Sequence, residues 1–167
     1  MWATAISALR SPTMQALMND HSWLWPSFEI AHFIGMALLI GTVGLFDLRM
    51  LGLARGLPAA PMQRLIPWGL AGFAINLVTG IGFIAGNQWA VTEYGENPGF
   101  HWKVAFMALA GLNALVFYVT GVSKRVDALG PSDNAPLAAK AIATIGLTLW
   151  VGVICFGRLL PYLGDAF

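Results

Sequence analysis

Four long stretches without a charged residue constrain this chain more than any other feature. They hold 17, 28, 20 and 17 residues and cover positions 30–46, 65–92, 104–123 and 141–157. A helix needs about 20 mainly apolar residues to cross a bilayer, at about 1.5 Å of rise per residue. Apolar residues flank the two shorter stretches and extend them to that length. We therefore predict four transmembrane helices, near residues 26–50, 65–86, 99–122 and 138–160.

Composition supports the same class and excludes others. The 167 residues are 57% hydrophobic and only 10% charged, and the net charge is +1, whereas a soluble domain is roughly 25% charged. Disorder requires low hydrophobicity and high charge, a lone cysteine (Cys155) excludes a disulfide scaffold, and the near-zero net charge argues against nucleic-acid binding. Continuous apolar runs do not fit the alternating strands of a membrane β-barrel. The expected fold is an all-α, integral membrane four-helix bundle, with residues 1–167 as a single transmembrane domain.

The distribution of charge predicts the orientation in the membrane. Four spans place both termini on one side, here called side A. Side A carries three basic and five acidic residues, whereas the opposite side B carries six basic and three acidic residues. Short loops rich in Lys and Arg stay in the cytoplasm. We expect a multi-pass protein of the bacterial inner membrane, with side B cytoplasmic and both termini periplasmic.

The N-terminal segment, residues 1–24, precedes the first span and has a character of its own. It lacks the basic start and long apolar run of a signal peptide. Its apolar residues can share one face of a short interfacial helix that Pro12 interrupts. Two interpretations stay open, a lid packed on the bundle, which we favour, and a helix lying on the membrane.

Polar side chains gather at the side-A ends of the spans. Neutral imidazole is a good ligand for haem iron, and His32 and His101 come from different helices at similar depth. They could clamp one haem b, although their positions along their helices differ by about 4.5 Å of rise. Gly35, one helical turn from His32, could then admit a flat ligand. The remaining polar residues of this group are Glu29, which shares a helix face with His32, and Lys103 and Arg158, which could meet the haem propionates.

Other polar residues in the spans have simpler structural interpretations. Asn76 and Asn113 fall near mid-membrane, where side-chain amides commonly join helices. Asp47 and Arg49 lie at the side-B end of the first span. They are interpreted as a boundary marker, and the alternative is an ion pair with a basic residue of another helix. A copper site built on His32, Met36, Met107 and Cys155 is less favoured, because the sulfur side chains fit core filling or lipid contact as well.

Several strings resemble a family of small four-helix bacterial inner-membrane proteins. They are Trp25-Pro26 followed by Glu29-x-x-His32, the run from Phe46 to Gly52, Lys103 followed by the run from Leu109 to Asn113, and the run from Gly157 to Tyr162. That family is similar to a wider set that includes di-haem b-type cytochromes, copper-resistance membrane proteins and the membrane protoporphyrinogen oxidase. An early histidine and a later lysine recur in the set, and His32 and Lys103 match them. The resemblance implies a haem role for His32, but the four histidines of the di-haem cytochromes are not present here.

Two functions follow as expectations. The first is a one-haem protein that passes electrons near the periplasmic face, with a quinone or a periplasmic redox protein as its partner. The second is a cofactor-free accessory or structural subunit of a larger membrane complex. Either way, four short helices expose much apolar surface to the bilayer, so we expect a homo-oligomer or a partner subunit. A small transporter is disfavoured, because no inverted repeat is visible.

Overall fold

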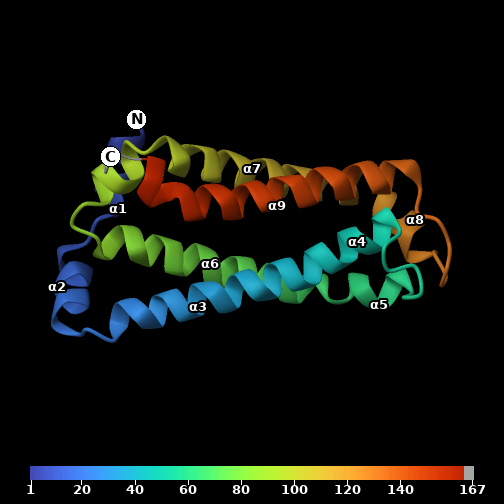
Figure 1. The fold of residues 1–167 in the computed structure, drawn as a ribbon, viewed down its shortest axis with the longest axis horizontal. Coiled ribbons are helices and arrows are strands. Elements are labelled where there is room, and N and C mark those ends of the chain that lie inside the picture. The colour runs from blue at the N-terminus through green and yellow to red at the C-terminus, as the bar shows by residue number, and fades with distance from the viewer. Residues whose placement is uncertain (164–167) are drawn as a thin grey trace.

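The computed structural model describes residues 1–163. They form a series of helices that loops connect (Figure 1). The helices are α1 Trp2–Leu9, α2 Pro12–Asp20, α3 Leu24–Leu39, η1 Ile40–Gly44, α4 Leu45–Leu51, α5 Ala59–Gln63, α6 Ile66–Gly86, η2 Val91–Gly95, α7 Pro98–Val119, α8 Val122–Asp127 and α9 Leu137–Leu163. Four segments are long and apolar enough to cross a membrane: Leu24–Leu51, Ala59–Gly86, Pro98–Val119 and Leu137–Leu163. The predicted all-α membrane bundle is therefore confirmed, and the chain is a multi-pass membrane protein.

The four spans form two helical hairpins. Helix α3 packs along α6, and α7 packs along α9; Figure 1 shows the two pairs as separate layers. The hairpins meet at the side-B end, where α4 packs on α9. Helix α1 and the end of α9 lie at the opposite end of the bundle (Figure 1). The two ends of the chain lie at the same end of the bundle because the number of spans is even.

Glycines allow α3 and α6 to approach closely. A Cβ atom on Gly72 would lie 2.5 Å from the Gly35 carbonyl oxygen, and one on Gly35 would lie 2.7 Å from the Gly72 carbonyl oxygen. Real Cβ atoms essentially never come that close to backbone, so both positions require glycine. Small residues at a membrane helix interface allow backbones to touch. The space beside Gly35 is thus filled by α6, and the structure gives this glycine a packing role instead of the predicted contact with a flat ligand.

A π-helical turn, η1, divides the first span. The Thr42 hydroxyl donates to the Leu38 carbonyl at 2.7 Å, and two of the five residues of the turn, at positions 41 and 44, are glycines. π-Turns interrupt the regular hydrogen-bond ladder and bend helices. The packing partner changes at this point, because α3 contacts α6 whereas α4 contacts α9. The bend therefore carries Asp47 and Arg49 from one hairpin towards the other.

Arg49 joins the two side-B loops. Its side chain is fully buried (0% exposed). The Nε–H donates to the Leu57 carbonyl at 2.6 Å, and the Nη groups donate to the carbonyls of Gly130 and Asp133 at 3.1 and 3.2 Å. The ion pair considered between Asp47 and a basic residue of another helix is not observed among the described residues, and the Arg49 guanidinium binds backbone carbonyls. Beneath it, a cluster that includes Phe46, Met50, Phe117 and Val126 closes this end of the bundle.

The N-terminal helices pack on the side-A end of the bundle. Pro12 occupies the first turn of α2, where its missing N–H costs little, and Ser11 caps this helix by accepting from the Met14 N–H. Ile6 of α1 and Met18 of α2 are buried, at 3% and 8% exposure. Helix α1 contacts η2, and α2 contacts α6. The segment therefore has the packed-lid arrangement that the sequence favoured over a helix lying free on the membrane.

Candidate functional site

His32 projects from α3 onto α6. Its Nδ1 lies 2.7 Å from the Thr79 hydroxyl, and its ring meets Phe83 edge to face with a centroid distance of 5.7 Å. Thr79 is buried and His32 is half-buried. Glu29 shares a helix face with His32 but is not hydrogen-bonded to it, and its carboxylate accepts from the Trp25 indole N–H at 3.1 Å. Thr79 is therefore the partner that sequence reasoning missed.

The Thr79 hydroxyl determines which nitrogen of His32 carries the proton. The Thr79 oxygen also lies 2.7 Å from the Ile75 carbonyl oxygen. A carbonyl only accepts, so the single hydroxyl hydrogen points to Ile75. Thr79 must then accept from His32, and Nδ1 carries the hydrogen. Nε2 keeps its lone pair, and no residue that the structure describes hydrogen-bonds to it. The imidazole is thus held in one orientation with one nitrogen available to a ligand.

Lys103 of α7 is the charged residue whose electric field acts on His32. The two side chains interact electrostatically across the gap between the hairpins. Its ammonium lies against α9, where a Cβ atom on Gly157 would be 3.6 Å from Nζ. Within the described part of the chain, Lys103 has no hydrogen bond or ion pair. His32 and Lys103 therefore both keep polar atoms that no described residue hydrogen-bonds. Arg158 is exposed at the same end of α9.

His101 has different neighbours from His32. Its Nε2 donates to the Gly95 carbonyl at 3.0 Å, and its ring stacks on Trp2 with a centroid distance of 4.9 Å. The backbone nearby is fixed by Asn97, which caps α7 at Gly99 N and donates to the Leu160 carbonyl at 2.8 Å. These contacts hold His101 beneath α1 with Nε2 occupied. The Nε2 atom of His101 is therefore engaged by the protein backbone.

The two mid-membrane asparagines differ in what they join. Asn113 donates from Nδ2 to the Ile142 carbonyl at 3.0 Å and so links α7 to α9, as the helix-joining interpretation predicts. Asn76 donates to the Gly72 carbonyl of its own helix at 3.0 Å, and its Oδ1 is buried without a partner in the described residues. Asn76 therefore fills the α3–α6 contact without bridging it by a hydrogen bond.

A cavity of about 260 Å³ lies between the hairpins in the side-B half of the bundle. All four spans line it, and its walls are mainly apolar, with aromatic side chains Phe46, Phe73, Phe117, Tyr118 and Trp150. Two polar side chains, Asp47 and Asn113, also face it. From the sequence alone, these two residues have unrelated structural interpretations. Neither His32 nor Lys103 lines this cavity.

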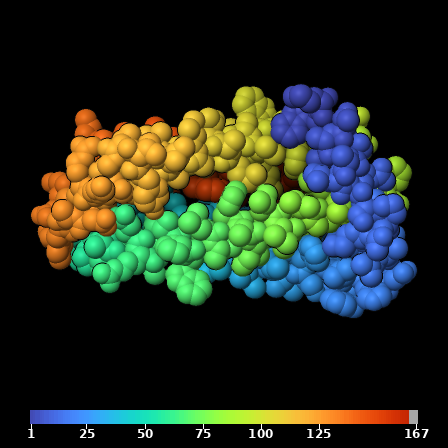
Figure 2. All heavy atoms as spheres, turned by 180° about the vertical axis from the view of Figure 1, so that it is seen from behind, coloured from blue at the N-terminus to red at the C-terminus, as the bar shows by residue number. Residues whose placement is uncertain are grey.

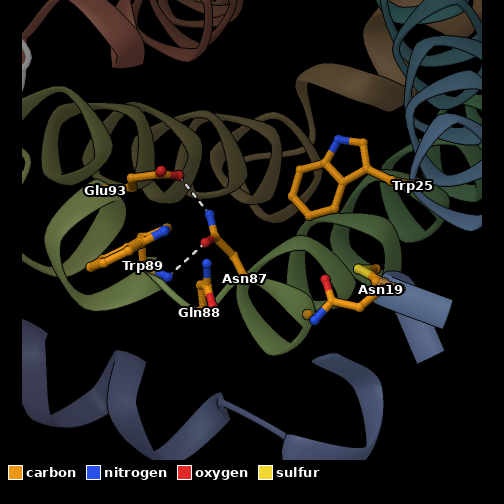
Figure 3. A pocket seen from close by; sticks show the side chains of 8 residues that line it. Asn19, Trp25, Asn87, Gln88, Trp89 and Glu93 are labelled. Carbon is orange, nitrogen blue, oxygen red and sulfur yellow. Dashed lines mark hydrogen bonds between the residues drawn. The ribbon is translucent and has the colours of Figure 1, made fainter. Parts of the chain in front are cut away.

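A second hollow, of about 390 Å³, opens at the side-A surface under the N-terminal lid (Figure 3). Figure 3 shows Asn87 at its centre, with the Asn87 amide donating to the Glu93 carboxylate and the Trp89 backbone N–H donating to Asn87 Oδ1. Both ends of the Asn87 amide therefore have hydrogen-bond partners within the hollow. Burial of the Tyr94 phenol raises its pKa; a hydrogen bond with Asn87 lowers this pKa by less, and the Glu93 charge raises it slightly further. The hollow is thus a surface feature of the lid.

Comparison of this chain with known proteins identifies no similar protein. No protein-family model, curated protein or solved structure matches this chain. The family resemblance drawn from the sequence strings therefore stays a prediction, and function rests on the geometry of the two sites.

Proposed function

We propose that this chain is a membrane protein that binds one haem b through His32 and passes electrons at its side-A face. The observation that carries the proposal is the orientation of His32. Thr79 holds Nδ1–H, and Nε2 is left with a free lone pair. Histidines that bind metals almost always donate their other ring N–H in this way.

In this proposal His32 is the single protein ligand of the haem iron. His101 is engaged with Gly95 and Trp2, so the proposal assigns it no ligand role and departs from the clamp of two histidines. Lys103, a half-buried cation without an ion pair among the described residues, would meet a carboxylate of the bound group, and Arg158 is an exposed cation at the same end of the bundle. A bound haem would supply one-electron chemistry, and the protein would tune it through the ligand and its hydrogen bond.

The cellular setting belongs to the same proposal. The excess of Lys and Arg on side B favours a cytoplasmic side B, which places His32 towards the periplasm of a bacterial inner membrane. A quinone or a periplasmic redox protein would exchange the electron. Assembly as a homo-oligomer or with a partner subunit is part of the same proposal, and the exposed apolar side chains of the spans are the surface that such a partner or the lipid would contact.

A visible spectrum tests the haem proposal. Protein expressed with haem available and purified in mild detergent should show a Soret band and a reduced-minus-oxidised difference. The His32→Ala variant should lose both, because the iron loses its protein ligand. The matched control is His101→Ala, which should keep both. A folded wild-type protein with a blank spectrum would overturn the proposal and leave the cofactor-free subunit as the alternative.

Replacing Thr79 by valine tests the role of the hydrogen bond to His32. Valine has nearly the same shape but cannot accept from Nδ1–H. We expect the variant to bind haem about 10- to 100-fold more weakly, as is typical when the partner of a metal-bound histidine is removed. Haem titration followed by the Soret absorbance measures this, with Thr144→Val as control because the Thr144 hydroxyl only donates to its own helix. Equal affinity in Thr79→Val and the wild type would contradict the assigned role.

A further inference from the structure

We propose that the cavity between the hairpins binds a small lipophilic amine, whose protonated nitrogen pairs with the carboxylate of Asp47. The site lies at a different depth from His32 and shares no lining residue with it. The inference therefore stands independently of the haem proposal.

Asp47 is a buried carboxyl group in the wall of the cavity. Its side chain is only 7% exposed and faces the cavity. No hydrogen bond or ion pair links it to any residue between positions 1 and 163. The basic residue closest in sequence, Arg49, already donates to three backbone carbonyls.

The elements packed against α4 do not supply a counter-charge either. Helix α5 and η1 contain no titratable residue, and α9 contributes Lys140 and Arg158. Neither of these two cations lines the cavity, and Tyr118 of α7 is the other titratable side chain there. An unpaired carboxylate is costly inside a membrane protein, and such groups mark binding sites or pathways. A ligand that brings a cation would remove this cost.

The other cavity walls suit an ammonium group on an apolar body. The Nδ2 of Asn113 donates one hydrogen to the Ile142 carbonyl. Its Oδ1 has no hydrogen-bond partner in the described residues and can accept a hydrogen bond from the ligand. Aromatic side chains such as Phe73 and Trp150 present π-systems that attract cations when water is excluded. Carboxylate, amide oxygen and aromatic faces together favour a protonated amine over an anion.

Glycine at position 146 makes room for this polar pair. A Cβ atom there would lie 2.9 Å from Asp47 Oδ2 and 3.2 Å from Asn113 Nδ2. Because α9 has no side chain at this point, groups from α4 and α7 can meet at its surface. Any larger residue would displace one of them from the cavity.

The shape of the bundle indicates entry from the lipid. Figure 2 shows a hollow between α6 and α7 with α9 at its base, and these helices also line the cavity. The side-B end is closed by the cluster around Phe46 and Met50 and by the loops that Arg49 joins. A ligand that partitions into the bilayer can reach such a site sideways. The volume of about 260 Å³ lies just below the roughly 300 Å³ lower end of ligand pockets, so the ligand should be small.

Calorimetric titration of the detergent-solubilised full chain with 4-phenylbutylamine tests the proposal, with the neutral 4-phenylbutanol as the matched probe. We expect saturable binding of the amine, and at least about tenfold weaker binding in Asp47→Asn, because one partner of a buried charge pair is lost. The control Asp127→Asn, an exposed carboxyl on side B, should bind like the wild type. Circular dichroism of each variant verifies folding.

A second variant changes the space around Asp47 without removing its charge. Gly146→Ala keeps Asp47 but pushes a methyl group against its carboxylate, so it should also weaken amine binding. The proposal is overturned if the wild type shows no saturable binding of the amine, if Asp47→Asn binds it equally well, or if the alcohol binds as tightly as the amine. The last result would mean that the cavity takes a neutral ligand and that Asp47 acts as a hydrogen-bond donor.

Discussion

Replacing Arg49 by methionine should lower the free energy of unfolding by about 3 kcal/mol or more. The change removes donors from three backbone carbonyls in two separate loops. A buried acceptor left without a donor costs about 1–3 kcal/mol. The unbranched methionine fills most of the space of the arginine stem, so the loss reports mainly the hydrogen bonds. Because the two loops belong to different hairpins, we expect the hairpins to separate more easily at the side-B end.

Unfolding by sodium dodecyl sulfate, followed by circular dichroism, measures this effect on the purified protein. Arg125→Met is the matched control, since Arg125 lies on the same side, carries the same charge and is exposed. The control should stay within about 0.5 kcal/mol of the wild type, as is usual for surface substitutions. If both variants unfold alike, Arg49 acts as a surface charge and not as the link between the loops.

Replacing Gly72 by alanine should have the second-largest effect. The new methyl group would lie 2.5 Å from the Gly35 carbonyl oxygen and 2.9 Å from the Leu39 backbone nitrogen. Both atoms belong to the backbone of α3, so a side-chain rotation cannot relieve the clash and the two helices must move apart. Overpacking of this kind costs about 1–3 kcal/mol, and the wider separation also weakens the packing along the rest of the α3–α6 interface.

Gly80→Ala is the control for that prediction. It places the same methyl group on the same helix at a position with nothing within 4 Å. Alanine favours helix over glycine by about 1 kcal/mol, so this variant should be as stable as the wild type or more stable. The same detergent unfolding experiment compares the two. Equal stability of Gly72→Ala and Gly80→Ala would show that α3 and α6 do not make the close contact described.

The Gly72 variant also links the fold to the proposed site. Thr79 lies two turns along α6 from Gly72, and it holds His32 of α3 across the same interface. A wider interface lengthens that hydrogen bond. Gly72→Ala should therefore weaken haem binding in the direction of Thr79→Val, whereas Gly80→Ala should leave it unchanged.

The sequence by itself determined the class of fold, because the cost of placing charges and unpaired backbone in lipid leaves few alternatives. Long uncharged runs allow only membrane helices, and proline and charged residues mark where these end. The predicted ends of the first span, 26–50, thus lie close to the observed Leu24–Leu51. The predicted second span, 65–86, likewise matches α6, Ile66–Gly86. The candidate membrane segment that begins at Ala59 also includes the short helix α5, which a turn at residues 64–65 separates from α6.

Only the tertiary structure decided what the polar residues do, because their roles depend on partners far away in the chain. His32 is 47 positions from Thr79, and Arg49 is 81 and 84 positions from two of its acceptors. The sequence located a polar group at the side-A ends of the helices, but it could not show that His101 contacts Gly95 and Trp2. It also could not show that the π-turn in the first span brings Asp47 to the second hairpin. These outcomes follow from how helices pair and bend, which hydrophobic pattern alone leaves open.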